Sequence, residues 1–278
     1  MTARVLLAAV LLGSLLSGCS GSEEPGDPEP STSPSADGAS PTARPSAAAV
    51  PAPETGACYR LTYAEALAPT VDAEPVPCAR RHTARTFAVG ELDTVVDGHL
   101  LAVDSARVRR QVATTCPRRL GGFLGGTEDD RRLSMLRAVW FTPTLEESDQ
   151  GARWFRCDVI AVAGPDRLAP LARRVAGALG RPAGRDRYGM CGTAAPDAPE
   201  FARVVCSAAH SWRAVAVVDL PAGRYPGAGA VRQAGQTPCE DAGREAATDP
   251  LDFRWGYEWP TRAQWADGQT YGLCWVPD

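Results

Sequence analysis

The chain has 278 residues, a length typical of one or two domains once any targeting segment is removed. Its hydrophobic content of 44% is enough for a folded core, and its formal net charge of -4 gives no reason to expect a nucleic-acid partner, which favours basic patches. All 29 basic residues are Arg. The absence of Lys excludes enzymes that depend on a Schiff-base lysine, a P-loop lysine or a Ser–Lys dyad.

Residues 1–18 have the pattern of a lipoprotein signal peptide. Arg4 supplies the positive charge, an apolar stretch follows, and Leu16-Ser17-Gly18-Cys19 matches the bacterial lipobox. We therefore expect cleavage before Cys19 and a diacylglyceryl group on its thiol, because two acyl chains hold a membrane stably. This predicts a lipid-anchored chain at the extracytoplasmic face of the cell membrane. An ordinary secretory peptide followed by an incidental Cys is the alternative.

Residues 19–55 follow as a Ser-, Pro- and Ala-rich tract with no aromatic residue. Such a composition buries too little apolar surface to offset the entropy of ordering, so a disordered tether is expected.

Eight further Cys form two sets of four whose surroundings match in order. An even count in an exported chain is typical of disulfides. Each set contains a Cys-x-x-x-His motif followed by an alternating apolar run, and in each set a Pro precedes the last Cys by the same interval. The ordered series indicates two copies of one small domain. The eight are Cys58, Cys78, Cys116, Cys157, Cys191, Cys206, Cys239 and Cys274.

In the first copy, residues 73–78 and 83–91 are predicted strands, followed by a helix over 103–120 and by strands over 133–142 and 152–163. A connector with helical spacing of its apolar residues covers 164–187. The second copy repeats the series. Its predicted strands are 202–206, 211–219, 253–259 and 269–276, with a helix near 228–247.

The predicted fold is α+β, with two tandem disulfide-stapled domains that each have a mostly antiparallel sheet and one helix. The first domain is expected over 56–163 and the second over 188–278. Connectivity cannot be deduced from sequence. We expect the first Cys of each set to pair with the second and the third with the fourth, since these pairs close the shorter loops.

His82 and His210 are candidate binding residues because His is scarce, with three in the chain. A metal site or a general base would use them, but the Cys thiolates that zinc prefers should be tied up as disulfides. Structural roles are therefore expected, without a metal or cofactor. Arg85 and Arg213 follow each His by three residues, so on an alternating strand they point to the opposite face.

Alternation also places Phe253, Trp255, Tyr257 and Trp259 on one face of a strand. Such a stripe, if exposed, suits a peptide or sugar contact, although faces of this kind often belong to a core. Hydrolase signatures such as G-x-S-x-G and H-E-x-x-H are missing, so no enzyme activity is expected.

The order G-x-C, C-x-x-x-H, T-x-C, W-x-x-P and a final aromatic-x-x-C resembles the actinobacterial septum-formation domain family. Where the family pattern has Pro before the His and an acid three residues after it, this chain has Arg81 and Ala209, then Arg85 and Arg213. The resemblance implies a non-catalytic role in the cell envelope, linked to division or septum assembly, with a protein or cell-wall partner. An envelope enzyme using His82 or His210 and a purely structural spacer are the alternatives.

Overall fold

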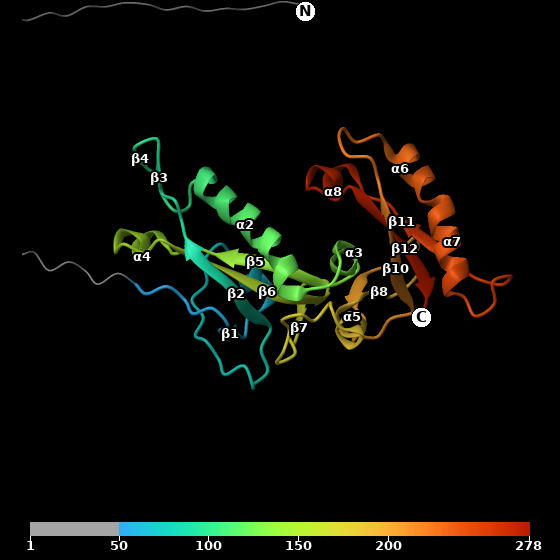
Figure 1. Cartoon of the computed structure of the whole chain (residues 1–278), viewed down its shortest axis with the longest axis horizontal. Helices are drawn as coiled ribbons and strands as arrows, with labels where there is room; N and C mark the ends of the chain where they lie inside the picture. The colour runs from blue at the N-terminus through green and yellow to red at the C-terminus, as the bar shows by residue number, and fades with distance from the viewer. Residues whose placement is uncertain (1–49) are drawn as a thin grey trace, which may run out of the picture. The chain divides into compact units, whose positions relative to one another are not determined.

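A computed structural model describes residues 50–278 (Figure 1). The expected signal peptide, Cys19 and nearly all of the expected tether lie outside the described residues. Among the residues that the structure describes, no helix has the length and apolar character needed to cross a bilayer.

The first half of the described chain forms a five-stranded antiparallel sheet (Figure 1). Helix α2 (Ala106–Leu124) packs against one face, where Val108, Val112 and Cys116 meet Phe155 and Cys157 of the sheet. The strands, in spatial order, are β1 (Cys58–Tyr59), β2 (Ala84–Glu91), β6 (Trp154–Gly164) and β5 (Leu136–Phe141), with β7 (Arg167–Ala169) also paired to β6.

Shorter elements complete this half. They are helices α1 (Tyr63–Leu67), α3 (Glu128–Arg132) and α4 (Leu145–Asp149) and the hairpin of β3 (Val95–Val96) and β4 (His99–Leu100). The predicted strand over 73–78 is wrong, since only Val76 forms an isolated bridge, to Cys58. Pro75 and Pro77 lack the N–H groups that a ladder needs.

The second half forms another five-stranded antiparallel sheet, covered by α6 (Ala228–Ala234) and α7 (Gln236–Ala246). The helix predicted over 228–247 is therefore interrupted, at Gly235. The strands, in spatial order, are β11 (Gly256–Glu258), β12 (Tyr271–Pro277), β10 (Trp212–Asp219), β8 (Met190–Gly192) and β9 (Arg203–Val205), with α5 (Pro182–Tyr188) before β8 and α8 (Arg262–Ala266) before β12.

Local details recur between the halves. The strand after each His carries a register shift opposite a disulfide cysteine, between Thr86 and Ala88 in β2 and between Ala214 and Ala216 in β10. A capping box begins both α4 and α8, in which the N-cap Thr and the side chain three residues later satisfy each other's backbone N–H groups.

Each half contains two disulfides, which have the expected pairing of first to second and third to fourth cysteine. The bonds are Cys58–Cys78, Cys116–Cys157, Cys191–Cys206 and Cys239–Cys274. Cys116 and Cys239 tie helices α2 and α7 to the central strands β6 and β12.

One hydrophobic cluster takes side chains from both sheets, among them Leu136 and Val159 of the first and Leu273 and Trp275 of the second. The segment between the sheets contributes to the same cluster. The helix expected there is absent before α5. The backbone is irregular, and it still places Leu171, Val175 and Leu179 in the buried cluster. Main-chain bonds from Met135 N to Tyr188 O and from Met190 N to Leu133 O join the halves further.

Candidate functional site

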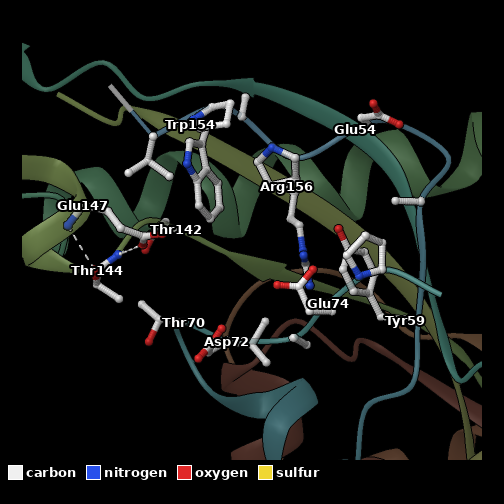
Figure 2. A pocket seen from close by; sticks show the side chains of 18 residues that line it. Glu54, Tyr59, Thr70, Asp72, Glu74, Thr142, Thr144, Glu147, Trp154 and Arg156 are labelled. Carbon is white, nitrogen blue, oxygen red and sulfur yellow. Dashed lines mark hydrogen bonds between the residues drawn. The ribbon is translucent and has the colours of Figure 1, made fainter. Parts of the chain in front are cut away.

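A hollow of about 750 Å³ opens beside β1 and β6 of the first sheet (Figure 2). Its walls are two coil segments, 50–54 and 70–75, and the loop after β5. Tyr59 and Arg156 line it from the strands. We call it the Arg156 pocket.

Arg156 is held in place by aromatic rings and one acid. Its side chain is 4% exposed, and its guanidinium carbon lies 3.8 Å from the ring centre of Tyr59 and 4.6 Å from that of Phe141. Because β6 alternates, Arg156 and Asp158 share a face, and Nη2 lies 3.2 Å from Oδ2 of Asp158. Nη2 is thus ion-paired with Asp158, whereas Nε of Arg156 has no acceptor among the described residues. The guanidinium keeps unused donor capacity beside the pocket.

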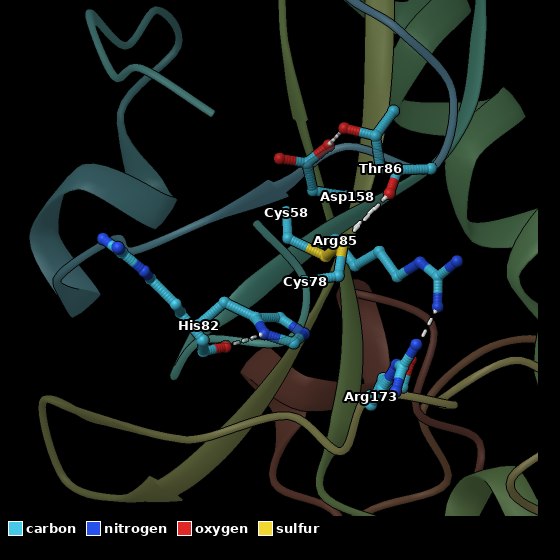
Figure 3. Close-up of a disulfide and its surroundings, with 9 residues drawn as sticks. Cys58, Cys78, His82, Arg85, Thr86, Asp158 and Arg173 are labelled. Atoms are coloured by element: carbon cyan, nitrogen blue, oxygen red, sulfur yellow. Dashed lines mark hydrogen bonds between the residues drawn. A yellow bond between two sulfur atoms is a disulfide. The ribbon is translucent and has the colours of Figure 1, made fainter. Parts of the chain in front are cut away.

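Asp158 is fully buried, and its Oδ1 accepts a hydrogen bond of 2.7 Å from the Thr86 hydroxyl (Figure 3). Burial disfavours the charged carboxylate and raises the pKa of Asp158 to about 6, although the neighbouring Arg156 and Thr86 lower it in part. The carboxylate is thus ionised at neutral pH and balances the Arg156 charge.

The pocket combines buried donors with an acidic rim. The indole Nε1 of Trp154 is buried and has no acceptor among the described residues. Glu54, Asp72 and Glu74 are exposed around the opening (Figure 2), and Glu147 caps the N-terminus of α4. The arrangement places buried hydrogen-bond donors in the pocket wall and carboxylates at the rim, where they attract a cation.

The two predicted histidines do not line this pocket. His82 is 1% exposed, its Nδ1 lies 2.9 Å from the Arg80 carbonyl, and its Nε2 has no partner among the described residues (Figure 3). His210 repeats the first contact, with Nδ1 2.7 Å from the Ala208 carbonyl. Both rings therefore close the turn that precedes a strand.

The second histidine has an acidic partner that the first lacks. Nε2 of His210 lies 3.0 Å from Oδ2 of Asp278, and Nε of Arg213 donates to the same oxygen at 2.6 Å. The prediction that His210 and Arg213 point to opposite faces is wrong, because His210 precedes β10 and lies outside the alternation. In the first half, strand pairing places Ala161 where Asp278 stands, and Arg85 donates to the Arg173 carbonyl instead (Figure 3).

Replacing Asp278 by Ala is expected to lower the free energy of unfolding by about 0.5 kcal/mol at pH 7, discounted for solvent screening of a partly exposed pair. Partial burial favours a raised pKa, but the hydrogen bonds from Arg213 and His210 outweigh it and lower the pKa of Asp278. The stabilisation by Asp278 is therefore present above the ordinary pKa of an Asp and is lost as pH falls through the lowered pKa of Asp278 in the folded chain. Urea unfolding at pH 7 and pH 2.5 measures it, with the exposed Asp252→Ala as control; equal losses at both pH values would contradict the expectation.

Among the described residues, Cys191, His210 and Asp278 bring ligand atoms within 4.8 Å of one another. The Cys191 sulfur is bonded to Cys206, so it is not a thiolate ligand.

The predicted aromatic face is partly buried, with Tyr257 in the core and Phe253, Trp255 and Trp259 half-buried. Tyr257 is 6% exposed, and its hydroxyl donates to the Val231 carbonyl of α6 at 3.1 Å. A Cβ added to Gly235 would clash with the Tyr257 ring, so that helix junction packs directly on it. Trp255 packs against Gly243 of α7 through its Cβ.

The rings of Phe253 and Trp259 are half-buried, and an Arg guanidinium lies over each of them. Arg244 of α7 lies 5.3 Å from the ring centre of Phe253, and Arg232 of α6 lies 5.3 Å from that of Trp259. The predicted stripe is thus covered in part by α6 and α7, and Phe253, Trp255 and Trp259 keep some exposed surface.

Sequence reasoning did not single out Arg156 and Asp158. A signal was present, because both charges flank the disulfide cysteine Cys157 in a predicted strand whose following residues are apolar, and buried charges are rare unless they are paired or functional. The matching positions around Cys274 hold Leu273 and Trp275, so the pair exists in the first half alone.

A family model described as septum formation matches residues 55–254, which is more than half of the chain and includes the lining of the Arg156 pocket apart from segment 50–54. Neither a curated protein nor a solved structure matches the chain.

Proposed function

This chain belongs to the septum-formation family, and we propose that it is a lipid-anchored, extracytoplasmic binding protein of the bacterial cell envelope that acts in septum formation. The observation that carries the binding role is the Arg156 pocket, in which the buried donors of Arg156 and Trp154 have no partner among the described residues. Unpaired buried donors are costly, so they favour a bound acceptor. The four disulfides support an oxidising compartment outside the cytoplasm.

The two halves are, in this proposal, two copies of one module. Their sheets are both antiparallel, and the order of cysteines, the His-to-carbonyl contact, the register shift and the capping box all recur. The Arg156–Asp158 pair distinguishes the first copy, which makes that copy the ligand-binding one.

Replacing Cys19 by Ala is expected to release the protein from the membrane, because the diacylglyceryl group is the proposed anchor. Membrane fractionation and intact mass of the wild-type chain measure this, and thiol counting should find no free cysteine. Replacement of Ser20 by Ala, next to the lipobox, is the matched control and should leave the chain on the membrane. A Cys19→Ala chain that stays in the membrane fraction would contradict the proposed lipid anchor.

The role in septum formation is tested by the position of the tagged full chain in dividing cells. Enrichment at the division site is expected for the wild type and should be lost with Cys19→Ala. A uniform distribution around the cell in both would contradict the proposed role.

A further inference from the structure

One wall of the Arg156 pocket is a stretch of backbone with unused hydrogen-bonding groups. Within segment 70–75, Val71 and Ala73 pack on the cluster around Tyr59, whereas Asp72 and Glu74 are exposed. This period of two is that of an extended chain. No main-chain N–H or C=O of Val71 to Glu74 makes a hydrogen bond with any described residue.

The ends of this stretch are nonetheless fixed. Thr142 N donates to the Pro69 carbonyl at 3.1 Å, and Val76 N donates to the Cys58 carbonyl at 2.7 Å. The stretch between them is therefore held in place with its backbone groups unpaired, as at the edge of a sheet. A ligand that pairs with it would lose little binding free energy in ordering this segment.

The charges around the opening favour a cation. The lining holds four carboxylates, of Glu54, Asp72, Glu74 and Glu147, against the single guanidinium of Arg156, which Asp158 already balances. An acidic ligand would meet this rim with like charge, whereas an ammonium or guanidinium group would be attracted.

We infer that the Arg156 pocket binds an extended peptide segment with a basic side chain, an inference that rests on the proposed binding function. The peptide main chain pairs with Val71 to Glu74 as an added strand. Its basic side chain reaches Asp72 and Glu74, and one of its carbonyl oxygens accepts from Arg156 or Trp154. This occupant satisfies the unpaired backbone, the buried donors and the acidic rim together, which a sugar or a free anion does not.

The test uses the full chain in non-ionic detergent and two peptides, acetyl-Ala-Ala-Lys-Ala-Ala and its Gln counterpart. Calorimetric titration is expected to show the Lys peptide binding about fivefold more tightly, the size of one exposed ion pair, with the difference shrinking in high salt. Hydrogen exchange is expected to slow about tenfold on binding at the alternate amides of residues 71–74 that face the added strand, as for one added hydrogen bond each. Equal affinity of the two peptides, unchanged exchange at 71–74, or no heat at about 10 mM peptide would each overturn the inference.

Variants on the exposed rim separate the inference from a folding effect. The pair Asp72→Asn and Glu74→Gln should bring the Lys peptide down to the affinity of the Gln peptide and leave the latter unchanged. The matched pair Glu245→Gln and Asp252→Asn removes the same charge from exposed acids elsewhere and should change neither affinity. If the rim pair has no more effect than this control, the cation site is excluded.

The two proposals fail in different ways. A chain that is enriched at the division site but binds neither peptide loses the ligand assignment and keeps its proposed role. A chain that binds the Lys peptide as described but is spread uniformly in the cell keeps the ligand and loses the septal role.

Discussion

Replacing Arg156 by Met is expected to lower the free energy of unfolding at pH 7 by about 1.4 kcal/mol through the protonation of Asp158. The substitution leaves the buried Asp158 carboxylate with the Thr86 hydroxyl as its hydrogen-bond partner among the described residues. The folded chain must then bury an unpaired charge or keep a proton that the unfolded chain releases. The wild type already bears this cost between the ordinary pKa of about 3.9 and the raised pKa of about 6, so keeping the proton costs the variant about 1.4 kcal/mol more for each pH unit above about 6. Urea unfolding at pH 7 measures the loss.

The same loss is expected to nearly vanish at about pH 4. Burial raises the pKa of Asp158 to about 6 even with Arg156 beside it. Since this pKa is above the unfolded value, the contribution of Asp158 favours folding at low pH and is lost as pH rises through about 6. Removing Arg156 extends that decline to higher pH. A loss of equal size at pH 4 and pH 7 would show that packing of Arg156 between its two rings, rather than charge, is what matters.

The matched control is the double variant Arg156→Met with Asp158→Leu. It removes both charges, and buried ion pairs replaced by apolar side chains are often neutral for stability. The second half already holds Leu273 and Trp275 at these two positions. The double variant should therefore recover most of the stability at pH 7 while abolishing peptide binding. A double variant as unstable as the single one would contradict the account.

Replacing Cys116 and Cys157 together by Ala is expected to cost about 4 kcal/mol of stability, the second large effect. The two residues are 41 positions apart in the chain, and both are fully buried between α2 and β6. The disulfide restricts the unfolded chain, and the longer the loop it closes, the more entropy it removes there. Thermal unfolding of the oxidised proteins, followed by circular dichroism, measures the difference.

The comparison bond is Cys58–Cys78, whose residues are 20 positions apart and which includes the half-buried Cys78. Its replacement by two Ala is expected to cost about 3 kcal/mol, because its loop is shorter. If the shorter loop proves the more costly to open, unfolded-state entropy does not control the ranking.

Much of the architecture is readable from sequence because its signals are local. The alternation after His82 and His210 predicted β2 and β10 within one residue, and the apolar period before Cys116 predicted α2. The prediction of secondary structure fails where tertiary packing, rather than local sequence, determines the backbone conformation. Pro75 prevents a strand that the apolar pattern allowed, and Leu171 and Val175 are buried without the helix that their spacing suggested.

The candidate site was harder to predict from the sequence, because its residues are far apart along the chain. Tyr59, Val71 and Arg156 meet only once β1, the coil after α1 and β6 are in register. The repeat also drew attention to what the two halves share, such as His82 and His210, whereas the pocket depends on a pair of charges that the second half lacks. Differences between copies of a repeat are therefore the more informative place to look for a ligand.

The hydrophobic cluster common to both sheets limits how this protein can change in evolution. Leu136 and Val159 share one buried cluster with side chains of the other sheet, so separating the halves would expose apolar surface of that cluster to water. A single-module relative must therefore carry polar residues at these positions, and a third module cannot be added here without a new face to receive it. Once joined in this way, the halves can diverge in chemistry, as the Arg156 pocket has, but can no longer be separated.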